Sequence, residues 1–186
     1  MADRIYLSCW LRGFTQHNML ASFEKVLRKF PYSRLAPVVT LRVYAVEFTE
    51  PPQMEEHFEN EIHPGQIIAR CREWENADCA YQVETSWDLW LYDHGSWQLA
   101  PTTITFTCFG PLFPSELGEQ LLVEFGLDSK FLPQPGLEGG TVPVRSNIRS
   151  LLHLVQDIAK SLPLEKKTLW SESGENLAEE LQRALE

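Results

Sequence analysis

The stretch that decides the fold spans residues 79–109, CAYQVETSWDLWLYDHGSWQLAPTTITFTCF. Residues 79–92 alternate apolar with polar side chains, which is the period-2 pattern of a half-buried β-strand. A turn of Asp-His-Gly-Ser composition at 93–96 leads into a second strand at 97–109, so the sequence predicts a long β-hairpin. The apolar parity of the second arm shifts across Pro101, where we expect a bulge or bend.

Upstream of the hairpin, the sequence predicts three further strands and one helix. Alternation predicts a strand at 5–11, and apolar residues at helical spacing predict a helix at 19–30. β-Branched and aromatic residues predict a strand at 38–48. A long acidic loop at 49–66 then leads to a weaker strand at 67–74.

Downstream of the hairpin, one more strand and two helices are predicted. Alternating apolar residues predict the strand at 121–127, and a Pro- and Gly-rich segment at 128–145 forms an irregular crossing. An apolar stripe at helical spacing predicts a helix at 146–162, capped by Ser146. A short C-terminal helix is expected at 173–185.

The resulting order, β-α-β-β-β-β-β-α-α, predicts an α+β fold over residues 1–186. It fits a single domain with an antiparallel sheet of about six strands and the helices packed on one face. A chain of 186 residues with 44% hydrophobic and 23% charged residues has the size and composition of one globular domain.

Charge is strongly segregated along this chain, whose net charge is −10. Residues 1–42 hold seven basic and two acidic residues, whereas residues 43–129 hold sixteen acidic residues and two basic ones. Such segregation bears on solubility and on partners, so it favours a cationic partner or contact with the basic N-terminal block of a second copy. Nucleic acid is not an expected partner, because phosphate binding requires concentrated positive charge.

The sequence also predicts the cellular location of the protein and the redox state of its cysteines. No stretch approaches the roughly 20 apolar residues of a membrane span, and residues 1–11 do not resemble an export signal. We therefore expect a cytoplasmic protein that does not enter a membrane. The four cysteines lie in predicted strands, and we expect them to be reduced and buried rather than disulfide-bonded.

Metal-ligand types occur in and after the acidic loop, but their spacing matches no metal signature. The loop holds five glutamates together with His57 and His63, and Cys71 and Cys79 extend the series. These residue types suit zinc, yet the close Cys-x2-Cys pairs of zinc sites are missing from the series. We predict no metal and no cofactor. The sequence also lacks the nucleophile-elbow and His-Glu-x-x-His motifs, which favours a non-enzyme.

A weaker candidate is an anion site at the predicted start of the helix at 146–162. Arg145, Ser146 and Arg149 lie there, after a Gly-rich segment, and helix N-termini attract anions. The glycines match neither a Walker nor a dinucleotide-binding fingerprint. A flexible crossing followed by an ordinary helix cap explains the same residues.

The leading functional hypothesis concerns one face of the predicted hairpin. Trp90 and Tyr92 share a strand face with Glu84 and Asp88, and large aromatic rings suit both cores and interfaces. We expect an interaction domain that uses this acidic, aromatic face to bind a protein partner or to form a homodimer with the basic first helix of a second copy.

Three alternatives to this hypothesis stay open. The chain's own helices or loops can cover the hairpin face. The protein can instead be a small-ligand carrier or enzyme with an apolar pocket between the sheet and the helix at 146–162; its element order is similar to that of helix-grip ligand-binding domains, without a shared motif. It can also be an acidic inhibitor or immunity-type protein for a basic partner.

Overall fold

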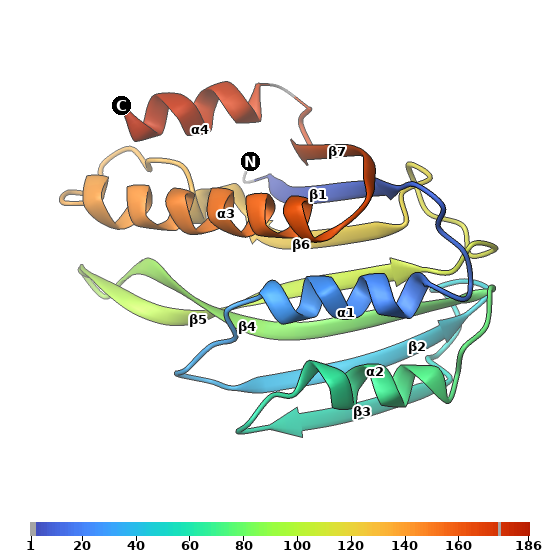
Figure 1. Cartoon of the computed structure of the whole chain (residues 1–186). Coiled ribbons are helices and arrows are strands. Elements are labelled where there is room, and N and C mark those ends of the chain that lie inside the picture. Colours follow the sequence, from blue (N-terminus) through green and yellow to red (C-terminus); the bar gives the residue numbers. More distant parts are fainter. Residues whose placement is uncertain (1–2, 175) are drawn as a thin grey trace.

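A computed structural model describes residues 3–174 and 176–186 of the chain. In chain order the elements are β1 (Arg4–Leu11), α1 (Met19–Lys29), β2 (Val38–Ala45), β3 (Met54–Glu59), α2 (Pro64–Arg72), β4 (Cys79–Asp93), β5 (Ser96–Phe109), β6 (Leu121–Leu127), the 3₁₀ turn η1 (Asp128–Lys130), α3 (Thr141–Ser161), β7 (Leu164–Ser171) and α4 (Leu177–Leu185). The strands form one antiparallel sheet in the order β3-β2-β4-β5-β6-β1-β7. Figure 1 shows α1, α2 and α3 on one face of this sheet and α4 beside the β7 edge. The α+β class with an antiparallel sheet is confirmed, with seven strands rather than six.

The predicted hairpin forms as β4 and β5. Their pairing runs without interruption from Ala80 opposite Phe109 to Asp93 opposite Ser96. The bulge expected at Pro101 is wrong, because the register is continuous there. The proline is tolerated because β6 pairs only with residues 105–108 of β5, which leaves the missing N–H of Pro101 at an unpaired edge. The parity shifts because the apolar side chains of β5 near the hairpin tip, Trp97 and Leu99, lie on the opposite face of the sheet from Ile104 and Phe106.

The strand predicted at 67–74 is wrong, because this segment folds as α2. Pro64 occupies the first turn of that helix, where its missing N–H has no partner to lose. Ile67, Ile68 and Cys71 form its buried face, at a spacing that a helix can bring together. Cys71 is therefore a buried helical residue and not a strand residue.

The acidic loop predicted at 49–66 contains the edge strand β3. Its side chains alternate between half-buried and exposed positions, and it pairs with β2 from Val38 opposite Glu59 to Val43 opposite Met54. The sequence does not show this alternation as an apolar-polar pattern, because the charged Glu56 occupies an inward position, where it pairs with Arg70 of α2. Charged side chains on an edge strand also oppose pairing with other chains.

A seventh strand, β7, was not predicted. It pairs with β1 from Ile5 opposite Ser171 to Leu11 opposite Leu164, and consecutive charged residues in its sequence mask the alternation. The terminal helix α4 begins at Leu177, later than expected, and buries Leu177 and Leu181 beside β7 and α3. None of the helices in residues 3–174 and 176–186 is both long and apolar enough to cross a membrane.

The long helix α3 begins at Thr141, five residues before the predicted start. Gly140 occupies the N-cap position, so the predicted cap at Ser146 is wrong, and the irregular crossing is correspondingly shorter. Pro143 lies in the first turn, where proline is compatible with a helix. This extra turn places Ser146 and Arg149 inside the helix.

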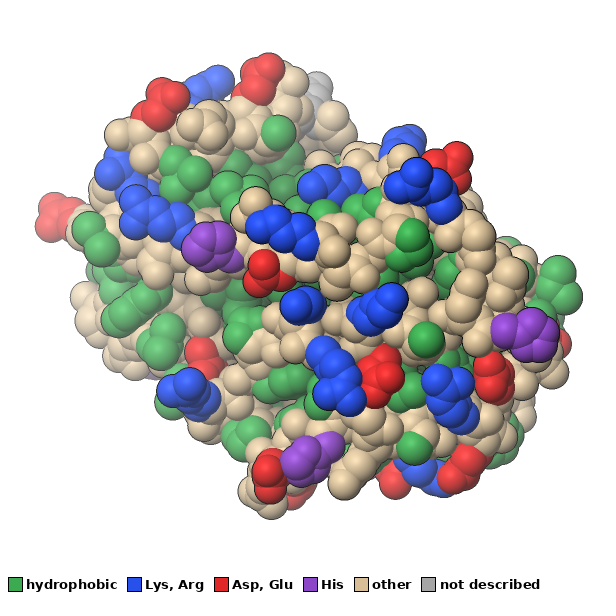
Figure 2. Space-filling model, in the orientation of Figure 1, with side chains coloured by type: hydrophobic (Ala, Val, Ile, Leu, Met, Phe, Trp, Pro, Cys, Tyr) green, Lys and Arg blue, Asp and Glu red, His purple; other side chains and the backbone are tan. Residues whose placement is uncertain are grey.

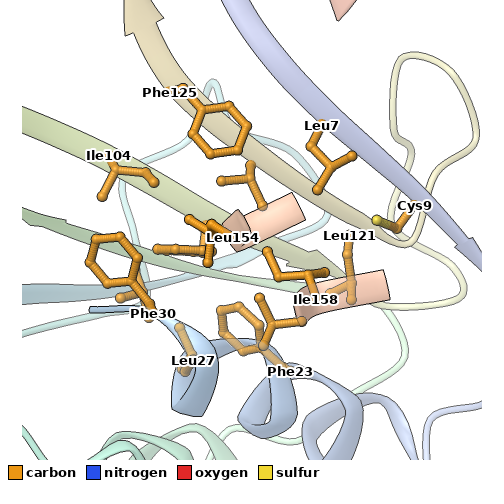
Figure 3. Close-up of a cluster of buried hydrophobic side chains, with 14 of the residues drawn as sticks. Leu7, Cys9, Phe23, Leu27, Phe30, Ile104, Leu121, Phe125, Leu154 and Ile158 are labelled. Atoms are coloured by element: carbon orange, nitrogen blue, oxygen red, sulfur yellow. The ribbon is translucent and has the colours of Figure 1, made fainter. Parts of the chain in front are cut away.

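The core lies between the sheet and the helices α1 and α3. Figure 3 shows Phe23 and Leu27 of α1, and Phe30 directly after this helix, near Leu154 and Ile158 of α3, with the strands behind them. Strand parity and the apolar stripe of the helix at 146–162 predict that six residues share one core: Trp87, Leu89, Ile104, Phe106, Leu151 and Val155. One cluster of the structure contains all six, and each is at most 8% exposed. That prediction is confirmed.

The opposite face of the sheet is covered only in part. Near the C-terminal end of β5 the rings of Tyr44, Phe48, Phe109 and Phe113 pack edge-to-face or tilted, with centroids 4.8 to 6.0 Å apart. At the other end of β5, toward the hairpin turn, large apolar side chains are exposed. That end carries the candidate site.

Candidate functional site

The tip of the β4–β5 hairpin carries a patch of four large side chains, Trp90, Tyr92, Trp97 and Leu99, which we call the tip patch. Trp90 pairs across the strands with Leu99, and Tyr92 pairs with Trp97, so each pair lies on one face of the hairpin. The rings of Tyr92 and Trp97 pack edge-to-face with centroids 5.5 Å apart. Trp90, Tyr92 and Leu99 are 36%, 40% and 45% exposed. The patch is therefore continuous and accessible.

The backbone beneath the tip patch is fixed by Asn147 of α3. β2 pairs with β4 only as far as Thr85, so the second edge of β4 has no strand partner at Trp90. Asn147 Oδ1 accepts the Trp90 N–H at 2.9 Å, and Asn147 Nδ2 donates to the Trp90 carbonyl at 2.8 Å. The same Nδ2 donates to the Lys130 carbonyl at 2.8 Å. The amide thus replaces a neighbouring strand and pairs with part-buried backbone groups of Trp90 and Lys130.

Trp97 links the tip patch to the start of α3. Its indole Nε1 donates to the Glu138 carbonyl at 3.2 Å. Gly140 packs so closely on this ring that an added Cβ would lie 2.7 Å from a ring carbon of Trp97. Only glycine fits there without displacing the ring. The tip is therefore held from two sides, by Asn147 and by the segment that precedes α3.

The two predicted acidic members of the face already have partners within the chain. Glu84 lies 3.7 Å from the Arg42 guanidinium, and Arg42 also forms an ion pair with Glu55 at 2.6 Å. Asp88 accepts hydrogen bonds from the Ser33 hydroxyl and, at 2.9 Å, from the Arg34 N–H. The structure thus separates the four predicted residues: Trp90 and Tyr92 remain available at the tip, whereas Glu84 and Asp88 hold neighbouring strands and loops in place.

The helix-covered face carries the opposite charge to most of the chain. Figure 2 shows Lys and Arg side chains gathered over α1 and α3 with few carboxylates among them. These two helices hold six basic and two acidic residues, a net charge of +4. Because the whole chain carries −10, the remaining residues carry −14. We call the surface of α1 and α3 the basic helix face; its basic residues are Lys25, Arg28, Lys29, Arg145, Arg149 and Lys160.

The residues of the predicted anion site do not meet at a helix N-terminus. Arg145 Nε donates to the Ala184 carbonyl at 3.3 Å, in the last turn of α4, where a cation complements the unpaired carbonyls. Ser146 is half-buried within α3, and Arg149 is exposed one turn further along. Arg145 therefore joins α3 to α4, and the N–H groups at the start of α3 lie about a turn away from this arginine.

The metal-ligand types of the sequence are dispersed. His57 Nδ1 lies 2.9 Å from the Thr40 hydroxyl on the outer sheet face, and His63 lies beside Glu61. Cys71 and Cys79 are buried, and burial raises the pKa of their thiols to about 12 and about 11. Within residues 3–174 and 176–186, no group of three or more His, Cys, Asp or Glu side chains is arranged to hold a metal ion.

The space between the sheet and α3 is filled by side chains. Ile148, Leu151, Leu154 and Ile158 of α3 are at most 3% exposed and belong to the same core as the strands. Hollows that involve α3 open on the surface instead. One of about 100 Å³ lies beside Trp97 and Val144, and one of about 250 Å³ lies beside the C-terminal end of α1. This packing gives no support to a ligand pocket under the helix.

Sequence reasoning missed Asn147, Trp97 and Leu99 as members of the site. A signal for Asn147 exists, because it is the one polar residue among the seven buried positions of α3. A buried amide in an apolar stripe requires hydrogen-bond partners, and such a residue marks an anchoring point. For Trp97 and Leu99, the shift of apolar parity across Pro101 was interpreted as a bulge or bend, so the face that they share with Trp90 and Tyr92 was not recognised.

Comparisons with known proteins give no family for this chain. No family model matches it, and no curated protein and no solved structure matches it either. The function is therefore inferred from the chemistry of the tip patch and of the basic helix face.

Proposed function

We propose that this protein is an interaction domain that self-associates through its tip patch. The observation that supports this most is the gathering of Trp90, Tyr92 and Leu99, all exposed, on a hairpin whose backbone is anchored by Asn147. Aromatic residues that are exposed and held in place dominate the energy of protein interfaces, since their burial costs little conformational entropy.

The partner surface that fits the tip patch is the basic helix face of a second copy. The hairpin at 79–109 contains three acidic residues, Glu84, Asp88 and Asp93, and no Lys or Arg. The basic helix face carries a net charge of +4. Because Glu84 pairs with Arg42 and Asp88 is hydrogen-bonded to Ser33 and Arg34, the exposed Asp93 beside the tip patch supplies most of the attraction, which sets orientation and rate more than affinity. Each copy carries both surfaces. In a twofold dimer, the tip patch of each copy therefore contacts the basic helix face of the other copy.

The chemistry of the thiols supports a binding role over nucleophilic catalysis. All four cysteines are free and buried. Burial raises the pKa of the Cys9 and Cys71 thiols to about 12, so the reactive thiolate is scarce at neutral pH.

A complementation experiment tests the proposal. Trp90→Ala removes one of the four large side chains of the tip patch, and the hydrogen bonds to Asn147 survive because they use only the Trp90 backbone. The double variant Lys25→Glu and Lys29→Glu cancels the net charge of +4 of the basic helix face. Each should be monomeric alone by sedimentation, and an equimolar mixture should regain dimer, because one intact contact forms between the two variants.

The matched control is Trp74→Ala. Trp74 is 38% exposed, close to the 36% of Trp90, but it lies just after α2, near the end of β4 opposite the tip patch, where its carbonyl accepts the Tyr81 hydroxyl. This variant should associate as the wild type does. If Trp74→Ala and Trp90→Ala weaken association equally, or if the mixture stays monomeric, the assignment of these two surfaces is wrong.

A further inference from the structure

A separate hollow lies at the end of β5 opposite the hairpin turn. Residues 110–119, which connect β5 to β6, enclose about 360 Å³ there, within the range of about 300 to 1,000 Å³ typical of small-ligand sites. Its apolar walls are three phenylalanines and two prolines: Phe14, Phe109, Phe113, Pro111 and Pro114. The tip patch contributes nothing to this hollow.

The wall of this hollow also contains a buried carboxylate, Glu119, which is only 3% exposed. Its Oε2 accepts the Leu117 N–H at 2.9 Å. Among the described residues, no Lys, Arg or His side chain forms an ion pair with it. A cation that enters the hollow would therefore meet a carboxylate that has no other cationic side chain beside it.

Backbone hydrogen bonds hold the connection that forms the hollow against the chain around the start of β4. Gly110 donates its N–H to the Cys79 carbonyl at 2.8 Å, and Leu112 donates to the Ala77 carbonyl at 2.8 Å. An added Cβ on Gly110 would lie 2.3 Å from the Ala77 carbonyl oxygen, so this close approach requires glycine. These contacts fix the backbone at the start of the connection, on one side of the hollow.

We propose that this hollow binds an organic cation, an alkylammonium or guanidinium group, with Glu119 as its counter-ion. The Phe14, Phe109 and Phe113 rings contribute their electron-rich faces, which attract cations within about 6 Å. A bare metal ion fits less well, because Ca²⁺ and Mg²⁺ require about six oxygen ligands, several of them carboxylates, and Glu119 is the one carboxylate among the residues that line this hollow. The site is independent of the proposed self-association.

The experiment is a titration of the full-length protein with n-butylammonium chloride at constant ionic strength, followed by backbone amide NMR. We expect saturable shifts at residues 109–120 and at Phe14, and none at the tip patch. The neutral ligand 1-pentanol has a similar shape and should bind at least tenfold more weakly. Equal binding of the two ligands, or the absence of saturable shifts, would overturn the proposal.

Two variants test whether Glu119 is the counter-ion of the bound cation. Glu119→Gln keeps an oxygen that accepts the Leu117 N–H, and it should weaken n-butylammonium binding at least tenfold. Glu116→Gln removes the same charge from an exposed position of the same connection, and it should leave the dissociation constant unchanged. Wild-type affinity in Glu119→Gln would contradict the counter-ion role. If Glu119→Gln does not fold, Phe14→Leu serves instead, because Phe14 is only half-buried, and unchanged affinity in that variant would exclude the aromatic wall.

Discussion

Replacement of Leu151 by Ala tests how α3 is packed on the sheet. Leu151 is 0% exposed and lies in the core cluster with residues from α1 and from the strands. The truncation removes apolar contacts and leaves a cavity that the packed strands cannot close, so both terms destabilise the folded state.

The expected cost is about 3 kcal/mol, within the range of about 2 to 5 kcal/mol for fully buried leucines. Total stability for a domain of this size is on the order of 10 kcal/mol, so the variant still folds. A loss of about 3 kcal/mol should lower the melting temperature by roughly 6 to 12 °C. With a urea slope of about 2 kcal/mol per molar, the midpoint should fall by about 1.5 M.

Urea unfolding followed by tryptophan fluorescence and by far-UV circular dichroism measures this loss, and the two midpoints should agree. The control is Val142→Ala in the first turn of the same helix, where Val142 is 77% exposed. It should change stability by less than about 0.5 kcal/mol. An unchanged midpoint for Leu151→Ala would show that α3 turns a different face to the sheet.

Three further predictions concern Asn147, the four cysteines and the metal content of the protein. Asn147→Asp keeps the acceptor for the Trp90 N–H but cannot donate to the part-buried carbonyls of Trp90 and Lys130. It should destabilise by about 2 kcal/mol and speed amide exchange at Trp90, whereas Ser146→Ala should not. The four buried thiols should react with a disulfide reagent only after unfolding. Burial raises the pKa of the Cys9 thiol to about 12, so above about pH 9 this thiol ionises in the unfolded state but not in the folded state. The urea midpoint should therefore fall between about pH 9 and pH 11 and stay level below pH 9. Elemental analysis should find no stoichiometric divalent metal, and a chelator should leave the melting temperature unchanged; one zinc per chain would contradict this.

Elements with strong local periodicity were predictable from sequence. The hairpin at 79–109, α1 and the apolar stripe of α3 each repeat at a period that one element alone explains. Trp90 and Tyr92 were placed correctly on one strand face by the same parity argument. These predictions required no knowledge of which elements pack together.

The elements that were missed owe their structure to contacts distant in sequence. β7 carries consecutive lysines and becomes a strand because β1 offers it a free edge. β3 tolerates Glu56 at an inward position because Arg70 of α2 pairs with it. The short apolar run at Ile67 and Ile68 suits either a strand or a helix, and packing against α1 decides between them.

The same distinction applies to the candidate site. Its aromatic residues follow from strand parity, but Asn147 lies 57 residues from Trp90, and no local pattern connects them. Likewise, the internal pairing of Glu84 and Asp88 depends on Arg42 and on the chain around Ser33, which only the folded sheet brings close. The acidity of the hairpin was therefore overestimated as a free surface charge.

Sedimentation velocity of the wild type over a wide range of concentration tests the proposed self-association most directly. We expect the sedimentation coefficient to rise from a monomer value to a dimer value as concentration increases. Trp90→Ala should weaken the dimer by about 2 kcal/mol or more, which is roughly thirtyfold in Kd, while Trp74→Ala leaves it unchanged. A wild-type protein that sediments as a monomer at the highest concentration, at both low and physiological salt, would contradict the account.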